Sequence, residues 1–169
     1  MKIFIGFETD YPEAFQVCAE SIRQYNPNHE IIPLVKSELE EQGLYTRPYQ
    51  GESTEFAFTR FLVPALCEWK GYALFCDGDF MWRCDPQEIE DLVKQSSKSP
   101  SVWVVKHPPF LTTPHEKMRG KANMVYPKKY WSSLMYFNNE KCFTLTSELV
   151  NSWSAKDLHE FAWASEIGD

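Results

Sequence analysis

The stretch that decides the fold is YALFCDGDFMW, from Tyr72 to Trp82. Five mostly apolar residues lead into Asp77 and Asp79, and a large apolar cluster follows at once. A short apolar run that ends at turn residues predicts a buried strand over residues 72–76. Because a carboxylate beside a buried strand is costly unless its charge is compensated, the stretch also predicts a polar site where this strand ends.

Asp77 and Asp79 are spaced for a shared site. Alternate residues of an extended segment point to the same side, and open α/β sheets bind ligands at the carboxyl ends of their strands. Two convergent carboxylates repel each other unless a cation lies between them. Mg²⁺ or Mn²⁺, with room left for substrate phosphates, fits these oxygen ligands. Gly78 would allow a close backbone approach or a positive φ. A solvated acidic turn without metal is the alternative.

The N-terminal third predicts a strand, a helix and a second strand. Residues 2–7 read as a buried strand, and Asp10 is expected to cap a helix. The apolar face of that helix has the spacing i, i+3, i+4 and i+7, at Phe15, Cys18, Ala19 and Ile22. Residues 30–35 form the second predicted strand, in which Pro33 favours an edge position. This order is typical of a parallel α/β sheet.

The remaining elements continue the α/β pattern. Residues 37–53 and 107–130 read as loops, and a helix starting at Thr54 is expected to break near Pro64. Further predicted elements are a helix over 87–94, strands over 101–106 and 133–138, and a last helix over 155–164. Without a repeat or linker, residues 1–169 are predicted to form a single domain.

Composition narrows the class of protein. The 169 residues are 43% hydrophobic, which indicates a globular chain. A net charge of −7 without a basic run disfavours nucleic-acid partners. No stretch approaches the roughly 20 apolar residues of a membrane span, and the start is too short for a signal peptide, so a cytoplasmic protein that is not integral to a membrane is expected. Five cysteines without a CxxC pair are expected to be buried free thiols.

Several segments together resemble a known family. KIFIGFETDYPEAF…CAESIR, TEFAFTRFLVPAL, YALFCDGDFMW and YWSSLMYFNN, in this order, look like metal-dependent nucleotide-sugar glycosyltransferases of the GT-A fold. The bacterial and phage proteins similar to glycosyltransferase family 8 are the nearest group, and VVKHPP, KMRG, YPKKYWSS and LHEFAW add to the match. The resemblance implies a Rossmann-like, mostly parallel central sheet flanked by helices.

The same resemblance implies an activity. It is the transfer of a hexose, with retention, from a nucleotide-sugar to an unidentified acceptor, with UDP-glucose or UDP-galactose as the expected donor and Mn²⁺ or Mg²⁺ as cofactor. Haloacid-dehalogenase-type phosphatases also carry two aspartates at this spacing. Their motif follows the first strand and is succeeded by a small hydroxyl residue, whereas here a later strand precedes it and Phe80 follows, which disfavours that family.

The resemblance also assigns residues to the donor. Asp77 and Asp79 match the metal ligands, and Gly78 lies between them at the diphosphate. The nucleotide's base and ribose are matched by Phe7, Glu8 and Thr9, each of which could instead be a core or capping residue. Arg60 matches an arginine directed toward the donor. Its alternative is an ion pair with an acidic neighbour such as Glu55.

Sugar and acceptor contacts are matched more loosely. Trp131, Ser132 and Ser133 correspond to the segment beside the sugar pocket, although a buried Trp is an equal alternative. His107 and His159 are further candidates, and for His159 a half-buried, hydrogen-bonded side chain is the preferred interpretation. The resemblance identifies no catalytic nucleophile.

One departure from the family leaves the function open. Related transferases supply a third metal ligand, a histidine in a Gly-rich C-terminal block, and residues 1–169 contain no such block. A second hypothesis is therefore a nucleotide-sugar-binding remnant or partner subunit without turnover. A third is a homo-oligomeric scaffold that associates through an exposed aromatic patch around residues 80–82.

Overall fold

The computed structural model describes residues 1–106, 116–117, 121–122 and 130–168. The strands are β1 (Lys2–Gly6), β2 (Glu30–Leu34), β3 (Tyr72–Cys76), β4 (Val102–Lys106), β5 (Glu116–Lys117), β6 (Lys121–Ala122), β7 (Tyr130–Asn138) and β8 (Ile167–Gly168). The helices are α1 (Pro12–Arg23), α2 (Lys36–Glu41), α3 (Phe56–Thr59), η1 (Arg60–Leu62), α4 (Val63–Leu66), α5 (Gln87–Gln95), η3 (Asn139–Lys141), α6 (Ser147–Ser152) and α7 (Ala155–His159).

A six-stranded sheet organises the described residues, in the order β2-β1-β3-β7-β4-β8. β1 pairs in parallel with β2 and β3, and β4 with β8, whereas β7 runs antiparallel to both of its neighbours. The predicted α/β fold with a mostly parallel sheet is therefore confirmed. β2, which contains Pro33, lies at the edge, where a missing backbone N–H costs least.

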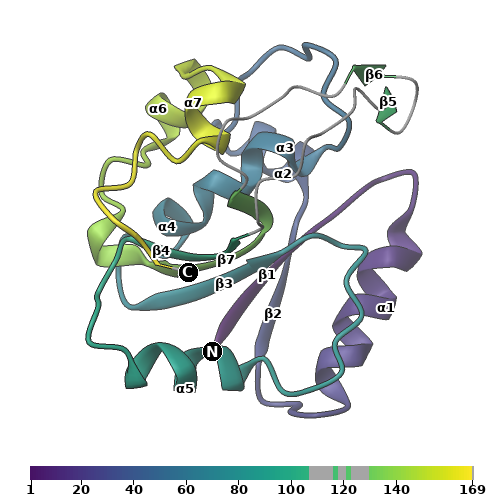
Figure 1. Cartoon of the computed structure of the whole chain (residues 1–169). Coiled ribbons are helices and arrows are strands. Elements are labelled where there is room, and N and C mark those ends of the chain that lie inside the picture. Colours follow the sequence, from purple (N-terminus) through teal and green to yellow (C-terminus); the bar gives the residue numbers. More distant parts are fainter. Residues whose placement is uncertain (107–115, 118–120, 123–129, 169) are drawn as a thin grey trace.

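Helices cover both faces of this sheet (Figure 1). α1 and α5 lie on one face over a core cluster that includes Ile3, Ile5, Cys18 and Ile22. The other helices lie on the opposite face, over a larger cluster to which Phe61 and Phe75 belong. The sheet is thus the middle layer of three, and the carboxyl ends of β1 and β3 lead into the loops that carry the candidate site.

Local sequence signals predicted most helices correctly, and the structure corrects three of the N-terminal predictions. α1 begins at Pro12 after Tyr11, so the expected cap at Asp10 is wrong; no side chain caps this helix. Residues 37–53 were predicted to be a loop but contain most of α2. The helix expected from Thr54 is divided into α3, η1 and α4, and Pro64 lies in the first turn of α4, where no intrahelical N–H bond is lost.

The C-terminal elements differ from expectation at their ends. β7 begins at Tyr130 instead of residue 133. α7 starts as predicted, with Ser154 Oγ accepting a hydrogen bond from Asp157 N, but it ends at His159. The chain leaves the helix because Phe161 takes a left-handed φ of 58°, which ends helices without requiring glycine. The predicted loop over 107–130 lies largely outside the described residues.

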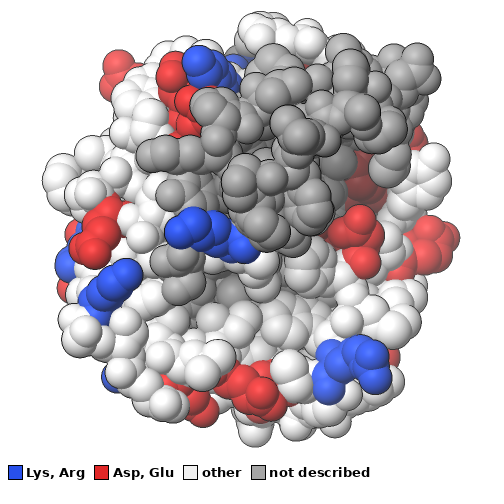
Figure 2. Space-filling model, viewed as in Figure 1, with Lys and Arg blue, Asp and Glu red and all other residues white. Residues whose placement is uncertain are grey.

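Charged side chains of both signs lie on the face of the molecule that Figure 2 shows. On the face in Figure 2, acidic and basic side chains of the described residues are interspersed among uncharged ones. Within the part of the chain that the structure describes, no helix has the length and apolar character needed to cross a membrane.

Candidate active site

The polar site lies where β3 ends. Asp77 continues the pairing of β3 with β7, because its backbone N–H donates to the carbonyl oxygen of Ser133 at 2.9 Å. Gly78 is buried with its backbone against Gly6 of β1, and a β-carbon added to Gly78 would collide with the Gly6 carbonyl oxygen. Of the two roles expected for Gly78, close approach is therefore the one used, and its φ is not positive. Asp79 is exposed at the rim.

Arg60 compensates the charge of Asp77. Its Nη1 lies 2.9 Å from Asp77 Oδ1, and the arginine is only 5% exposed. Arg60 is fixed on other sides by hydrogen bonds from Nε to the Phe56 carbonyl oxygen (3.0 Å) and from Nη1 to the Ser132 carbonyl oxygen (2.9 Å). Its guanidinium also lies 5.0 Å from the centre of the Phe75 ring. Arg60 thus forms an ion pair with an acidic residue, as the alternative interpretation expected, but the partner is Asp77 and not the suggested Glu55.

The positive charge of Arg60 only partly offsets the cost of burying the Asp77 carboxylate. Burial raises the pKa of Asp77 to about 6, Arg60 opposes this rise, and the charges of Asp79 and Glu8 add to it. Asp77 Oδ1 is buried, and although it is paired with Arg60, it accepts no well-aligned hydrogen bond from the described residues. One arginine therefore offsets only part of the cost of gathering these carboxylates.

An irregularity in β7 carries two candidate residues into the site. The partner of β4 changes from Met135 at Val104 to Trp131 at Val105, so residues 132–134 bulge away from β4. This places the Ser132 and Ser133 carbonyl oxygens against Arg60 and Asp77. Bulges of this kind commonly re-aim groups beside functional sites.

Ser132 joins this cluster to α7. Its Oγ lies 2.9 Å from His159 Nδ1, and the His159 ring packs edge-on against Phe61 at 5.1 Å between centres. His159 is half-buried, which confirms the preferred interpretation of this residue. Trp131 is 45% exposed, so of its two alternatives the buried core residue is excluded.

The residues that follow β1 are hydrogen-bonded to Glu55, which directly precedes α3. Glu8 Oε1 accepts from Glu55 N (2.6 Å), while Thr9 donates from N and Oγ1 to the two Glu55 carboxylate oxygens (3.1 and 3.0 Å). Phe7 packs edge-on against Phe15. A small polar cavity of about 60 Å³ lies beside these hydrogen bonds. Its lining residues are Glu8, Asp10, Lys36, Tyr45, Tyr49, Glu52, Thr54 and Glu55.

The structure thus gathers Arg60, Asp77, Ser132, Ser133 and His159 into one connected cluster. The triplet of residues 7–9 lies at the neighbouring strand end, and His107 falls outside the described residues. Among the described residues, no group of three or more His, Cys, Asp or Glu side chains is placed to hold a metal ion.

Sequence reasoning missed Glu55 as a partner of residues 8 and 9. No local signal could have found it, because 46 residues separate Thr9 from Glu55. A hollow of about 270 Å³ beside Asp79, between α1 and residues 78–81, was also unforeseen.

Comparison of the sequence with known proteins finds a relative but no family model. No family model matches the chain. Protein CDI of Arabidopsis thaliana is 39% identical over 175 residues, covering 99% of this chain, which spans 65% of that relative's length.

Several solved glycosyltransferases share the architecture. WbbM, a bifunctional glycosyltransferase, superposes with a TM-score of 0.65 at 15% identity, covering 99% of this chain and 38% of its own. GlyE of Streptococcus pneumoniae TIGR4 gives 0.59 at 10% identity, covering 99% of this chain and 44% of its own. The galactosyltransferase LgtC, solved with donor and acceptor sugar analogues, gives 0.56 at 10% identity, covering 99% of this chain and 72% of its own. At these identities the likeness establishes a common GT-A-like fold.

Proposed function

We propose that this chain is a glycosyltransferase domain that binds a nucleotide-sugar through a divalent cation at Asp77 and Asp79 and transfers the sugar to an acceptor. The observation that carries the proposal is the pair of aspartates at the carboxyl end of β3, one held by Arg60 and the other exposed. Ligands of open α/β sheets bind at this edge. The likeness to glycosyltransferases of the same fold adds support.

The residues present fit a hard cation such as Mn²⁺ or Mg²⁺. Asp77 and Asp79 offer carboxylate oxygens. The pKa of Asp77 is raised first by burial and further by the charges of Asp79 and Glu8, and a cation would offset both effects. When bound, the metal would supply Lewis-acid stabilisation of the diphosphate as it leaves the sugar. With two protein carboxylates it would keep positions for phosphate oxygens, as Mg²⁺ sites usually do.

The chain's own residues would bind and orient the donor. Arg60 holds Asp77 in place and brings positive charge to the site, although its hydrogen bonds to backbone carbonyls make it a positioning residue more than a direct phosphate ligand. Glu8 is directed at the backbone of Glu55, which fixes the loop where a base and ribose would lie. Trp131, which directly precedes Ser132, is 45% exposed, and an indole ring is suited to stacking on a sugar.

The finer assignment follows the family that the sequence resembles. UDP-glucose or UDP-galactose is the proposed donor, with transfer of the hexose in retained configuration. A nucleotide-sugar-binding domain without turnover is the second candidate. It is favoured by one observation, that the described residues supply no third His, Cys, Asp or Glu side chain for the metal.

A thermal-shift and turnover experiment tests the proposal. UDP with Mn²⁺ should raise the melting temperature of the protein, and UDP-glucose or UDP-galactose with Mn²⁺ should be hydrolysed or consumed in transfer. Asp79→Asn should abolish both effects, whereas Asp91→Asn, an exposed carboxylate on α5, should change neither. Stabilisation without turnover would favour the second candidate. No response to nucleotide with or without metal would overturn both.

A further inference from the structure

A buried pair of cysteines lies directly behind the aspartate loop, residues 77–79. Cys18 of α1 and Cys76, the last residue of β3, have their sulfur atoms 3.8 Å apart, and both side chains are fully buried. Because Cys76 precedes Asp77, the pair is one residue from the candidate active site. The two cysteines are 58 residues apart in the chain, so they meet only because α1 packs on β3.

The two thiols are placed to form a disulfide after a small movement. A disulfide has an S–S bond of about 2.05 Å, so the two sulfur atoms must approach each other by about 1.8 Å. Rotation about the Cα–Cβ bonds and a small displacement of α1 can supply this approach, because the thiols already contact each other. Cys142, which is also buried, instead donates from its sulfur to the carbonyl oxygen of Ser101 at 3.1 Å.

The contact between the thiols gives them different reactivities. The hydrogen bond from Cys76 lowers the pKa of Cys18, although burial opposes this effect. The same contact, together with burial, raises the pKa of Cys76. Since the thiolate is the form of cysteine that reacts with oxidants, Cys18 should be oxidised first, with Cys76 in place to react with the product.

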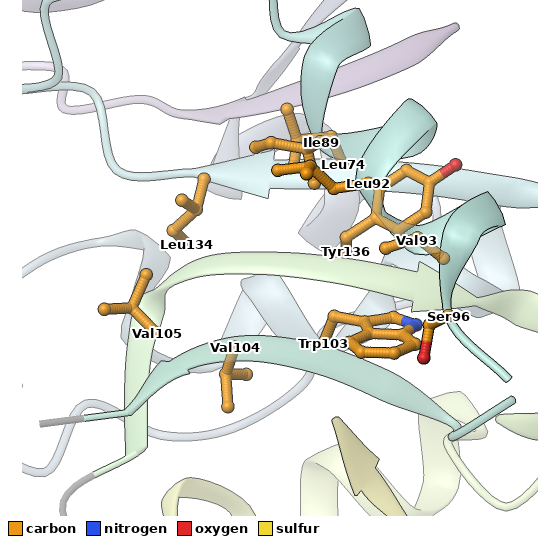
Figure 3. Close-up of a pocket in the computed structure, with 10 residues that line it drawn as sticks. All are labelled: Leu74, Ile89, Leu92, Val93, Ser96, Trp103, Val104, Val105, Leu134 and Tyr136. Carbon is orange, nitrogen blue, oxygen red and sulfur yellow. The ribbon is translucent and has the colours of Figure 1, made fainter. Parts of the chain in front are cut away.

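Small oxidants can approach the pair from two sides. Outside α1, a hollow of about 560 Å³ is lined by Ser21, which donates to the carbonyl oxygen of Cys18 at 2.7 Å, and by Trp82. A second hollow of about 370 Å³, under α5, extends to Leu134, the residue of β7 that pairs with Cys76 (Figure 3). Because the thiols themselves are buried, an oxidant reaches them only by local opening, which favours a neutral molecule little larger than water.

We propose that Cys18 and Cys76 form a redox-active dithiol site whose substrate is a small peroxide. The Cys18 thiolate attacks one peroxide oxygen, the O–O bond breaks, and hydroxide leaves, so that Cys18 becomes a sulfenic acid. The Cys76 sulfur then attacks the Cys18 sulfur, the S–O bond breaks, and a second hydroxide leaves. The two thiol protons convert both hydroxides to water. One hydrogen peroxide and two thiols thus give one disulfide and two water molecules, with the sulfur atoms oxidised and the peroxide reduced.

Formation of the bond should displace the aspartate loop. Gly78 lies in a narrow space between the end of β1 and the first turn of α1. A β-carbon at Gly78 would collide with the Gly6 carbonyl oxygen and would lie 3.9 Å from the backbone nitrogen of Phe15. A shift of α1 toward Cys76 must therefore move this loop, because close-packed β1 leaves it no room on the other side.

The residues after the aspartate loop are also attached to α1. The backbone N–H of Trp82 donates to Ser21 Oγ at 3.0 Å, three residues after Cys18 on the same helix. A movement of α1 relative to β3 should lengthen or break this hydrogen bond. Oxidation of the pair is thereby linked to the position of Asp79.

Treatment of the Cys84→Ser protein with hydrogen peroxide tests the proposal, because this variant lacks the exposed thiol. Its mass should fall by about 2 Da, the two hydrogens lost on disulfide formation. The thiols that react with 5,5′-dithiobis(2-nitrobenzoate) in urea should fall from four to two, and dithiothreitol should restore them. Peptide mapping should find Cys18 joined to Cys76. Four remaining thiols, oxygen addition without a cross-link, or a cross-link between another pair would overturn the proposal.

Two variants in the Cys84→Ser background locate the reaction. Cys76→Ala should abolish the mass loss, whereas Cys67→Ala, the matched change of a buried thiol outside the pair, should leave it unchanged. Amide hydrogen exchange tests the displacement. In the oxidised protein the Trp82 N–H should exchange about three- to tenfold faster, as expected for one lost hydrogen bond, and the Leu149 N–H at the start of α6 should not change. Equal exchange of the Trp82 N–H in both forms would refute the displacement.

The effect of oxidation on donor binding rests on the proposed function. UDP with Mn²⁺ should raise the melting temperature of the reduced protein, and oxidation should remove most of this rise until dithiothreitol restores it. Failure of the reduced protein to respond to UDP would count against the proposed function alone, since the mass and the peptide map report the disulfide without any nucleotide. An equal response of the two forms would show that the disulfide does not alter the site at Asp79.

Discussion

Arg60 Nη1 lies 2.9 Å from Asp77 Oδ1, and the same nitrogen donates to the carbonyl oxygen of Ser132. This guanidinium thereby joins η1, the end of β3 and the bulge of β7. Because Arg60 is 5% exposed, the pair is sensitive to the loss of either member: removing one partner leaves a buried charge uncompensated.

Arg60→Met should lower the free energy of unfolding by about 3–5 kcal/mol, since it leaves Asp77 unpaired and two backbone carbonyls without their donor. Asp77→Asn should also destabilise the protein strongly, because it leaves the buried charge of Arg60 without a counter-charge. Urea unfolding followed by circular dichroism measures both. In the double variant Arg60→Met/Asp77→Asn the cost should fall well short of the sum. Additive costs would contradict the coupling.

Gly78→Ala should destabilise the protein by about 1–3 kcal/mol, because its new methyl group would collide with the Gly6 carbonyl oxygen and push the aspartate loop away from β1. Gly43→Ala is the matched control. Gly43 has open space around its Cβ position and a φ of 70°, so its substitution costs only the left-handed strain of about 1 kcal/mol. Thermal unfolding of the two variants compares collision with strain. A smaller loss for Gly78→Ala than for Gly43→Ala would refute the close approach.

The contrast between these residues shows what the sequence could predict. The strand before Asp77 and the need for glycine at 78 follow from local pattern, because apolar runs, turn residues and alternation act over a few positions. The identity of the residues that pair with Asp77, Arg60 and Ser133, does not follow from the local pattern. Seventeen residues separate Asp77 from Arg60 and 56 from Ser133, and which groups meet is decided by strand order and by the register change between Val104 and Val105.

Helix ends show the same limit in another form. The cap at Ser154 was predictable from a hydroxyl residue three positions before an acid, and it is present. The end of the same helix was not predictable, since Phe161 adopts a positive φ that is uncommon outside glycine, and its ring packs edge-on against Phe61, which is distant in the sequence. Tertiary packing, which the local pattern does not encode, fixes this turn.

Thiol accessibility gives a prediction for the five cysteines. Cys84 is exposed, and the other four, including the Cys18–Cys76 pair with sulfur atoms 3.8 Å apart, are buried. Under native conditions one thiol per chain should react rapidly with 5,5′-dithiobis(2-nitrobenzoate), and the remainder only on unfolding, because a buried thiol is shielded from the reagent. Cys84→Ser should remove the rapid phase. Two or more fast thiols in the native protein would be incompatible with this burial.

The depressed pKa of Asp85 predicts how the free energy of unfolding depends on pH. Burial raises its pKa, but hydrogen bonds from His29 (2.6 Å), the backbone N–H of Gln87 (2.9 Å) and Asn26 (3.1 Å) outweigh that effect and hold the pKa below its usual value. A carboxylate whose pKa is depressed on folding contributes stability above its unfolded pKa of about 3.9 and loses it as the pH falls through the folded value.

Asp85→Asn should therefore lower the free energy of unfolding by about 1–2 kcal/mol at pH 7, where the wild-type carboxylate is charged in both states. As the pH falls from about 5 toward 3, the wild type should lose this advantage and the two unfolding curves should converge. Urea unfolding at a series of pH values measures the difference, with Asp91→Asn, on the exposed side of α5, as control. A difference between wild type and Asp85→Asn that stays constant from pH 7 to pH 3 would show that the charge of Asp85 contributes nothing to this network.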